Sequence, residues 1–139
     1  MAKFTCFEEI QAWKKAREMV KVVNRVSKYP EFWRDFSLRD QIKRAGYSIM
    51  ANIAEGFERG GNKEFIHFLT MAKGSAGEVK CLAYIALDQE YISKEEFANI
   101  SNLCTESGAM IYGLIKYLKK SGLKGIKFDD SFVTMNNQL

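Results

Sequence analysis

Four stretches of the chain carry apolar residues at every third or fourth position, which is the repeat of one face of an α-helix. The pattern predicts helices over residues 7–27, 38–58, 63–88 and 94–120. No stretch shows the alternation of apolar and polar residues that is typical of a half-buried strand. The single proline, Pro30, lies between the first two predicted helices and interrupts neither of them.

Residues at the ends of these segments support their boundaries. Ser37 and Ser93 are expected to cap the second and fourth helices, because each is followed three residues later by an acidic residue that can complete a capping box. Gly60 and Gly61 are expected to end the second helix, and Asn62 is expected to cap the third.

The three connections are short, so neighbouring helices must run antiparallel. The predicted fold class is therefore all-α, an antiparallel up-and-down four-helix bundle that occupies residues 1–121. Beyond this range the apolar repeat fails, and residues 122–139 are expected to form an irregular C-terminal tail. The apolar residues of the tail are compatible either with docking on a neighbouring surface or with a frayed terminus.

The composition excludes several classes of protein. No apolar run approaches the ~20 residues of a membrane span, and the first ten residues lack the apolar core of a secretion signal. The three cysteines are an odd number without metal-ligand spacing, so they are interpreted as reduced thiols, with Cys81 and Cys104 as small packing residues. We therefore expect a cytoplasmic protein with no membrane partner.

Candidate chemistry is sparse. Glu64 and His67 have the spacing found in di-iron bundles, but such a site needs two of these pairs and His67 is the only histidine. No clustered zinc ligands, phosphate-binding glycine loop or nucleophile elbow is present. The sequence predicts no catalytic residues, no metal and no cofactor. The alternative, an enzyme, would require a bound metal or cofactor.

Basic residues recur every three or four positions along the first predicted helix. Five of them fall within about 80° of one another on a helical projection and extend over about 21 Å. We call these five residues the basic ridge: Lys14, Arg17, Lys21, Arg25 and Lys28. Three further cations at the start of the second helix are expected to extend it: Arg39, Lys43 and Arg44. A row of this kind suits the phosphates of a nucleic acid, and the alternative is a solvated charged face without a ligand.

The second and third predicted helices are apolar on more than one face. In a monomeric bundle each helix should keep one polar face, so the extra apolar positions indicate burial against a second copy of the chain. The residues expected at this interface are Tyr47, Met50, Ala54, Phe57, Tyr84 and Ile85. The alternative is that tyrosine and alanine tolerate exposure and need no partner.

Polar residues line one flank of each of the same two helices. The members that face one another if these flanks meet are Asn52, Glu55, Ser75 and Glu78. We expect them to form a hydrogen-bonded network that fixes the register of the helices, and a structural role is favoured over a catalytic one.

Several short runs carry a family resemblance: SIMANIAEG at residues 48–56, WKKA at 13–16, KEF at 63–65 and AKGS at 72–75, followed by Glu78. The chain resembles, over about residues 7–120, the bacterial four-helix bundle proteins encoded in intervening sequences of 23S rRNA genes. The resemblance implies a cyclic homopentamer. It also implies a relation to accessory proteins of diversity-generating retroelements, which work with a reverse transcriptase and bind nucleic acid.

The function predicted from these features is that of a non-enzymatic, homo-oligomeric accessory protein that binds nucleic acid, with RNA as the favoured ligand, through the basic ridge. The alternative is a protein-interaction scaffold with a protein partner and no role for nucleic acid.

Overall fold

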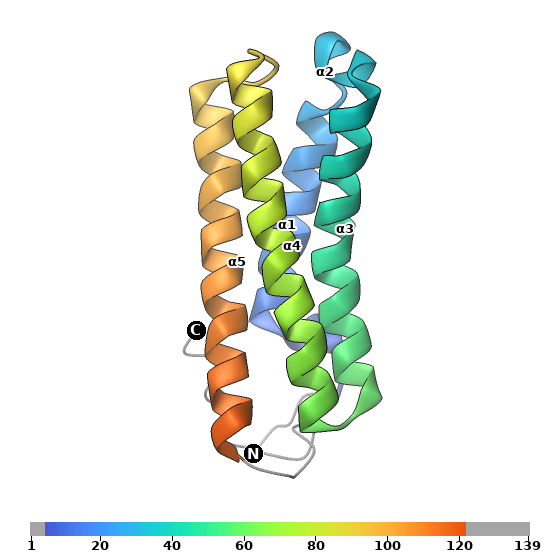
Figure 1. Cartoon of the computed structure of the whole chain (residues 1–139), viewed down its shortest axis with the longest axis vertical. Coiled ribbons are helices and arrows are strands. Elements are labelled where there is room, and N and C mark those ends of the chain that lie inside the picture. Colours follow the sequence, from blue (N-terminus) through green and yellow to red (C-terminus); the bar gives the residue numbers. More distant parts are fainter. Residues whose placement is uncertain (1–4, 122–139) are drawn as a thin grey trace.

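The computed structural model describes residues 5–121, which form four long helices that lie side by side (Figure 1). The long helices are α1 (Gln11–Val26), α3 (Phe36–Arg59), α4 (Asn62–Asp88) and α5 (Lys94–Ser121). A 3₁₀ turn, η1 (Phe7–Glu9), precedes α1, and a five-residue helix, α2 (Pro30–Arg34), lies between α1 and α3. The predicted C-terminal tail lies outside the described residues.

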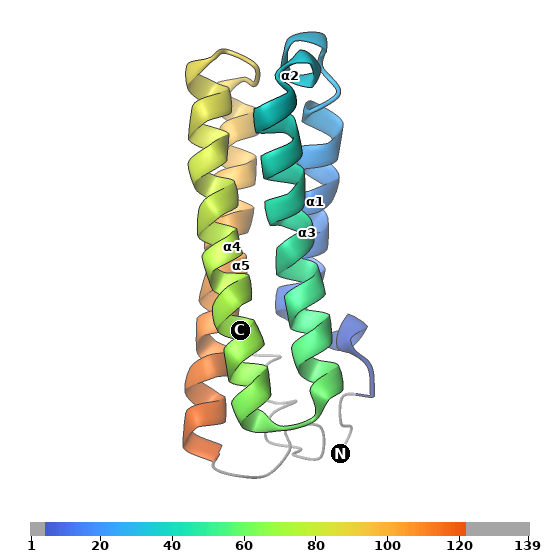
Figure 2. The same cartoon turned by 45° about the vertical axis from the view of Figure 1, so that its right-hand side comes forward.

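Successive long helices run in opposite directions, and each packs against the next one in the chain (Figures 1 and 2). α1 also packs against α5, which closes the ring of four. α1 and α4 therefore occupy opposite corners of the bundle. The prediction of an all-α, up-and-down bundle is confirmed.

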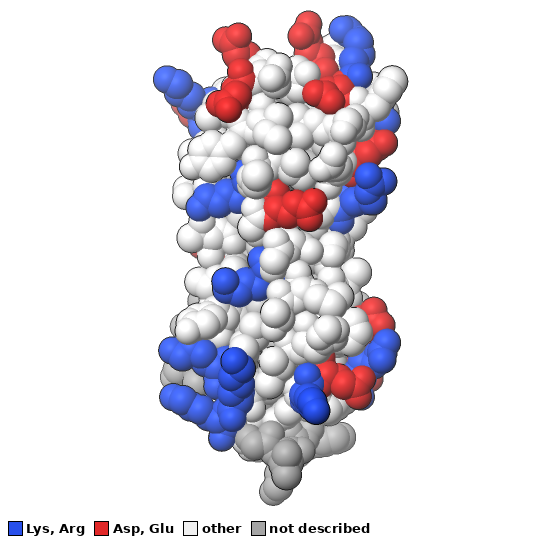
Figure 3. All heavy atoms as spheres, in the orientation of Figure 1, with Lys and Arg blue, Asp and Glu red and all other residues white. Residues whose placement is uncertain are grey.

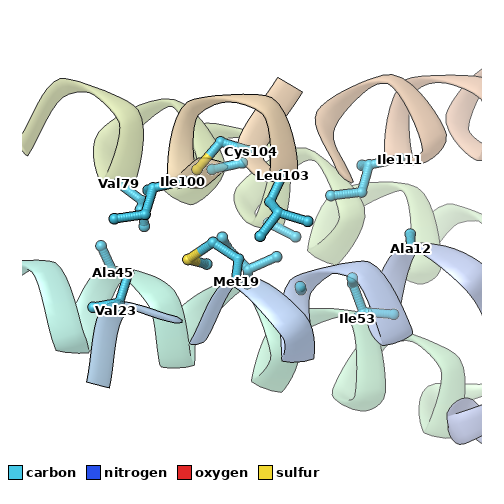
Figure 4. Close-up of a cluster of buried hydrophobic side chains, with 14 of the residues drawn as sticks. Ala12, Met19, Val23, Ala45, Ile53, Val79, Ile100, Leu103, Cys104 and Ile111 are labelled. Atoms are coloured by element: carbon cyan, nitrogen blue, oxygen red, sulfur yellow. The ribbon is translucent and has the colours of Figure 1, made fainter. Parts of the chain in front are cut away.

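Apolar side chains from all four long helices fill the centre of the bundle (Figure 4). Met19 of α1 and Ile53 of α3 are fully buried there, together with Ile111 of α5. Cys104 is also buried, and burial raises the pKa of its thiol to about 12, so it packs as a small apolar residue. Cys81, in contrast, is exposed on α4, so its predicted packing role was wrong.

The start of α3 differs from the prediction. Asp35, not Ser37, is the N-cap, and its Oδ1 accepts a hydrogen bond from the backbone N–H of Leu38 at 3.1 Å. The other carboxylate oxygen of Asp35 accepts a bond of 2.9 Å from the Tyr91 hydroxyl, in the loop between α4 and α5. Asp35 therefore starts α3 and also ties it to the neighbouring loop at the same end of the bundle.

Two further boundaries were predicted differently. Residues 31–36 had no helical repeat, yet Pro30 begins the short helix α2, because its fixed φ angle suits the first position of a helix. Asn62, predicted as the cap of the third helix, is its first residue, and Gly61 is the N-cap. Gly60, which has a left-handed φ of 88°, ends α3 as predicted.

The predicted capping box at the start of α5 is present. The N–H of Glu96 donates to Ser93 Oγ at 3.1 Å, and the N–H of Ser93 donates to Glu96 Oε1 at 2.8 Å. The hydroxyl of Tyr29, just after α1, also donates to the Glu96 carboxylate. The hydrogen bond from the Ser93 N–H, followed by that from Tyr29, lowers the pKa of Glu96 below its ordinary value.

Replacing Ser93 by alanine is expected to lower the free energy of unfolding by about 1 kcal/mol, because the N–H of Glu96 loses its acceptor. Since the pKa of Glu96 is lower in the folded state, its carboxylate stabilises the fold above its ordinary pKa of 4.5, and this contribution disappears as the pH falls through the folded-state value. Urea unfolding at neutral and acidic pH measures both effects. Ser37→Ala is the matched control, because Ser37 does not cap α3. A comparable loss of stability in Ser37→Ala would contradict the assignment of Asp35 as the N-cap of α3.

Candidate nucleic-acid interface

The basic ridge is an exposed row along α1. Lys14, Arg17, Lys21 and Arg25 lie on the helix and Lys28 lies in the turn after its end, and all five are exposed. The opposite side of α1 is buried in the core: Ala12, Ala16, Met19, Val22, Val23 and Val26. Burial of that side fixes the rotation of the helix, so the five cations must face the solvent.

The charges of the ridge are largely unpaired. Within residues 5–121, none of the five cations forms an ion pair within 4.0 Å. Arg17 lies 5.7 Å from the centre of the Trp13 ring, a contact that positions the guanidinium without neutralising it. Arg25 has an acidic neighbour, Glu96, whose charged form it favours. The ridge can therefore offer its charges to an anionic ligand.

Arg39 and Lys43 belong to a cluster with two aromatic residues, Trp33 and Phe36; we call these four residues the aromatic corner. The guanidinium carbon of Arg39 lies 4.4 Å from the centre of the Trp33 ring and 4.8 Å from that of Phe36. Lys43 Nζ lies 5.4 Å from the Trp33 ring. Neither aromatic residue was predicted as a site residue, and the only signal for them in the sequence is their proximity to basic residues.

The aromatic corner lies on the side of α3 that faces α1. One turn after Lys43, the Tyr47 hydroxyl donates a 3.3 Å hydrogen bond to Oδ1 of Asn24, which lies on α1 between Lys21 and Lys28. Figure 2 shows α1 and α3 side by side, with α2 at the end where they connect. The aromatic corner therefore continues the surface of the basic ridge.

Arg44 is placed elsewhere. It lines, with Gln41, Ser48, Ser75 and Glu78, a groove of about 470 Å³ between α3 and α4. Of the three cations expected to extend the ridge, Arg44 alone faces α4 instead of α1. A ligand that follows the ridge would contact Arg39 and Lys43 before it reached Arg44.

The hydrogen-bonded network between α3 and α4 includes only two of the four residues predicted for it. Asn52 Nδ2 donates to the carbonyl and hydroxyl oxygens of Ser48 at 2.8 and 2.9 Å, and Ser75 Oγ donates to Ser48 Oγ at 2.9 Å. The bonds from Asn52 lie within α3, and the Ser75–Ser48 bond connects α3 to α4 and helps to fix their register. Glu55 and Glu78 take no part in them; both are exposed, and Glu55 pairs with Arg59 at 2.6 Å.

The six residues predicted at an oligomer interface do not share one face. Phe57 is only 1% exposed and packs edge-on against Phe65, with ring centres 6.1 Å apart. Its ring belongs to the core of the chain, so its assignment to an interface was wrong. Tyr47 is exposed on the side of α1, whereas Met50 and Ala54 are half-buried.

Tyr84 and Ile85 are exposed on α4, on the other side of the bundle from the ridge. Uncharged residues cover much of the face formed by α4 and α5 (Figure 3). A groove of about 410 Å³ runs between these helices, and a side chain added at Gly77 or Gly108 on its wall would meet no atom within 4 Å. This face can therefore admit the close approach of another helix.

Residues 5–121 contain neither a cluster of metal ligands nor a helix suited to cross a membrane. No group of three or more histidine, cysteine or acidic residues converges there as metal ligands would. His67 is exposed and makes an edge contact with the Phe68 ring, 5.4 Å away. None of the helices in this range combines the length and apolar character needed to span a bilayer.

Comparison with known proteins agrees with the resemblance in the sequence. Residues 8–113 match the family described as 23S rRNA-intervening sequence protein. The crystal structure of a protein of unknown function from the S23 ribosomal protein family of Bacteroides thetaiotaomicron is 30% identical, with a TM-score of 0.69. The alignment covers 76% of this chain and 98% of that one. No protein with a curated description matches the chain. The chain therefore belongs to the family of 23S rRNA-intervening sequence proteins.

Proposed function

We propose that the protein is a non-enzymatic, self-associating accessory protein that binds nucleic acid, with RNA as its ligand, through the phosphates. The observation that carries the proposal is the basic ridge, in which five exposed cations follow one side of α1 and form no ion pair with any other residue between 5 and 121. The description of the family, which refers to 23S rRNA, supports RNA as the nucleic acid. No base-reading motif accompanies the ridge, so we expect binding to be largely independent of sequence.

Self-association would multiply the ridge. α1 and α4 lie at opposite corners of the bundle, so copies that associate through the side of α4 that carries Tyr84 and Ile85 would leave every ridge accessible. Two or more ridges that bind one RNA raise its apparent affinity without any new contact, because the later contacts form within one complex. We include a homo-oligomer in the proposal for this reason, and the family resemblance suggests a pentamer.

The dependence of affinity on salt tests the proposal. Five phosphate contacts on a single strand predict that log K falls with log salt with a slope of about −3.5 for each ridge that the RNA contacts, or about a hundredfold loss per ridge between about 50 and 200 mM salt. The variant Arg17→Gln/Lys21→Gln/Lys28→Gln removes three contacts and should reduce the slope by about 2. Titration of a labelled RNA, followed by fluorescence anisotropy, measures these slopes.

A matched control removes the same charge from another helix. Lys94, Lys119 and Lys120 are exposed on α5, and their replacement by glutamine should change the slope little. Equal slopes for the two triple variants would show that net charge, and not the ridge, determines binding. Absence of binding at low salt would contradict the proposal outright.

The second candidate is a scaffold that binds a protein through the exposed apolar residues on the face of α4 and α5. The observation in its favour is the exposure of large apolar side chains there, with Tyr84 51% and Ile85 42% exposed. This scaffold should keep its partner when the ridge is neutralised and lose it when Tyr84 is replaced, as measured by co-purification with a defined partner.

A further inference from the structure

Two large aromatic side chains of the aromatic corner are exposed beside one another. Trp33 is 43% exposed and Phe36 is 63% exposed, at the end of the bundle where α2 joins α3. One exposed apolar residue on a protein surface is ordinary, but two rings gathered around one arginine form a defined surface. Rings that remain this exposed contribute little to folding, and their flat faces suit contact with another aromatic group.

Arg39 holds the two rings in place. Its guanidinium lies over both rings, its Nη1 donates to the Trp33 carbonyl at 3.1 Å, and its Nε pairs with Asp40 at 3.0 Å. The Arg39 side chain is consequently only 17% exposed. Arg39 covers one face of each ring. The surface that Phe36 exposes to solvent therefore lies mainly on the part of its ring that Arg39 does not cover. The corner is thus a pre-arranged aromatic surface, and Arg39 is a positioning residue in it.

The surroundings of the rings favour an anionic ligand. Residues 28–44 contain five basic and three acidic side chains. Two of the acids already have partners in the structure, since Asp40 pairs with Arg39, and Asp35 accepts hydrogen bonds from the N–H of Leu38 and from Tyr91. A ligand that combines flat aromatic rings with negative charge is a nucleotide, whose base can stack while its phosphate lies near Lys43.

The position of the corner relates it to the ridge. The Tyr47–Asn24 hydrogen bond places this side of α3 against α1, and the ridge ends at Lys28, just before α2. A strand whose phosphates follow the ridge from Lys14 to Lys28 therefore arrives at the corner. Its bases can reach the rings only if they are unpaired, because a duplex keeps its bases stacked on one another.

We propose that the aromatic corner stacks unpaired bases of a single-stranded RNA whose phosphates lie along the basic ridge. This inference rests on the proposed function of the ridge and adds the class of nucleic acid. The ridge contacts phosphates of a single strand or a duplex alike, whereas the corner contributes only to binding of the single strand.

The test compares two probes on the same set of variants. The probes are a mixed-sequence RNA of about 20 nucleotides, long enough to span the ridge, and the duplex that it forms with its complement. In Trp33→Leu/Phe36→Leu the affinity for the single strand should fall roughly tenfold for each base that stacks, while the affinity for the duplex stays unchanged. The salt slope should also stay unchanged, because the phosphate contacts remain.

The matched control is Tyr84→Leu/Tyr112→Leu, which removes two similarly exposed rings from α4 and α5. Tyr84 lies on the face proposed for self-association, so any loss of association in this variant should weaken binding of both probes alike. The ratio of its single-strand affinity to its duplex affinity should therefore equal that of the wild type. The triple ridge variant should lose affinity for both probes, so a failure of the ridge is distinguished from a failure of the corner. Thermal unfolding of each variant confirms that the bundle is intact.

Fluorescence of Trp33 gives a second readout. The chain has two tryptophans, so Trp13→Phe leaves Trp33 as the sole tryptophan emitter. Stacking of a base on its ring should quench this emission when the single strand is added, and the duplex should leave it unchanged.

Three outcomes would overturn the inference. Unchanged single-strand affinity in Trp33→Leu/Phe36→Leu would exclude stacking and leave the ridge proposal standing. A change of oligomeric state in that variant, seen by sedimentation, would assign the corner to a contact between copies. A wild-type protein that binds neither probe at low salt would overturn both this inference and the proposed function.

Discussion

Valine in place of Gly56 is expected to lower the free energy of unfolding by about 3 kcal/mol, near the upper part of the range for overpacked sites. A Cβ atom at this position would lie 2.7 Å from the Cβ of Phe68 and 3.1 Å from Cδ1 of Phe65. The Cβ of Phe68 is attached directly to the backbone of α4, so it cannot move away unless the helix moves. The glycine therefore permits α3 and α4 to approach closely just before the turn that connects them.

The matched control is Gly74→Val, which introduces the same side chain in the middle of α4. Nothing lies within 4 Å of a Cβ at Gly74, so this variant should lose no packing and should gain a few tenths of a kcal/mol from its higher helix propensity. Thermal unfolding followed by circular dichroism separates the two variants by roughly 10 °C. Equal stability of the two variants would contradict the close contact at Gly56.

The long helices could be predicted from the sequence because their apolar residues repeat over about four or more turns. The same repeat placed the ridge cations on one side of α1, and burial of the other side makes them exposed. A helix of five residues is too short to show a repeat, so α2 was missed. The cap of α3 was missed for a related reason, because Asp35 is positioned by the end of α2 and by Tyr91, which is distant in sequence.

The contacts that each site residue makes could not be predicted from the sequence. Arg39, Lys43 and Arg44 are close in the sequence, yet the first two contact Trp33 and the third lines the groove beside α4. The neighbours of these cations depend on where α2 places Trp33. Helical spacing in the sequence does not predict the position of α2. The contacts of the polar network could not be predicted either. Ser48 connects Asn52 to Ser75 by hydrogen bonds, whereas Glu55 forms an ion pair with Arg59.

Replacing Phe57 by alanine is expected to lower the free energy of unfolding by about 3–5 kcal/mol, because the whole ring is removed from the core and leaves a cavity against Phe65. Sequence reasoning placed Phe57 with Tyr84 at an oligomer interface, and the structure separates the two residues. Tyr84 is 51% exposed and its ring contacts Phe97 with centres 4.5 Å apart, so Tyr84→Ala should cost less than about 1 kcal/mol within one chain.

The two variants therefore distinguish folding from assembly. Urea unfolding at two protein concentrations measures stability and any contribution from association, since an oligomer gains apparent stability with concentration. Phe57→Ala should be destabilised at both concentrations. Tyr84→Ala should keep the stability of the single chain and, if α4 is the contact between copies, should shift sedimentation toward smaller species. A stable Phe57→Ala would contradict its place in the core, and unchanged sedimentation of Tyr84→Ala would remove Tyr84 from any contact that holds the copies together.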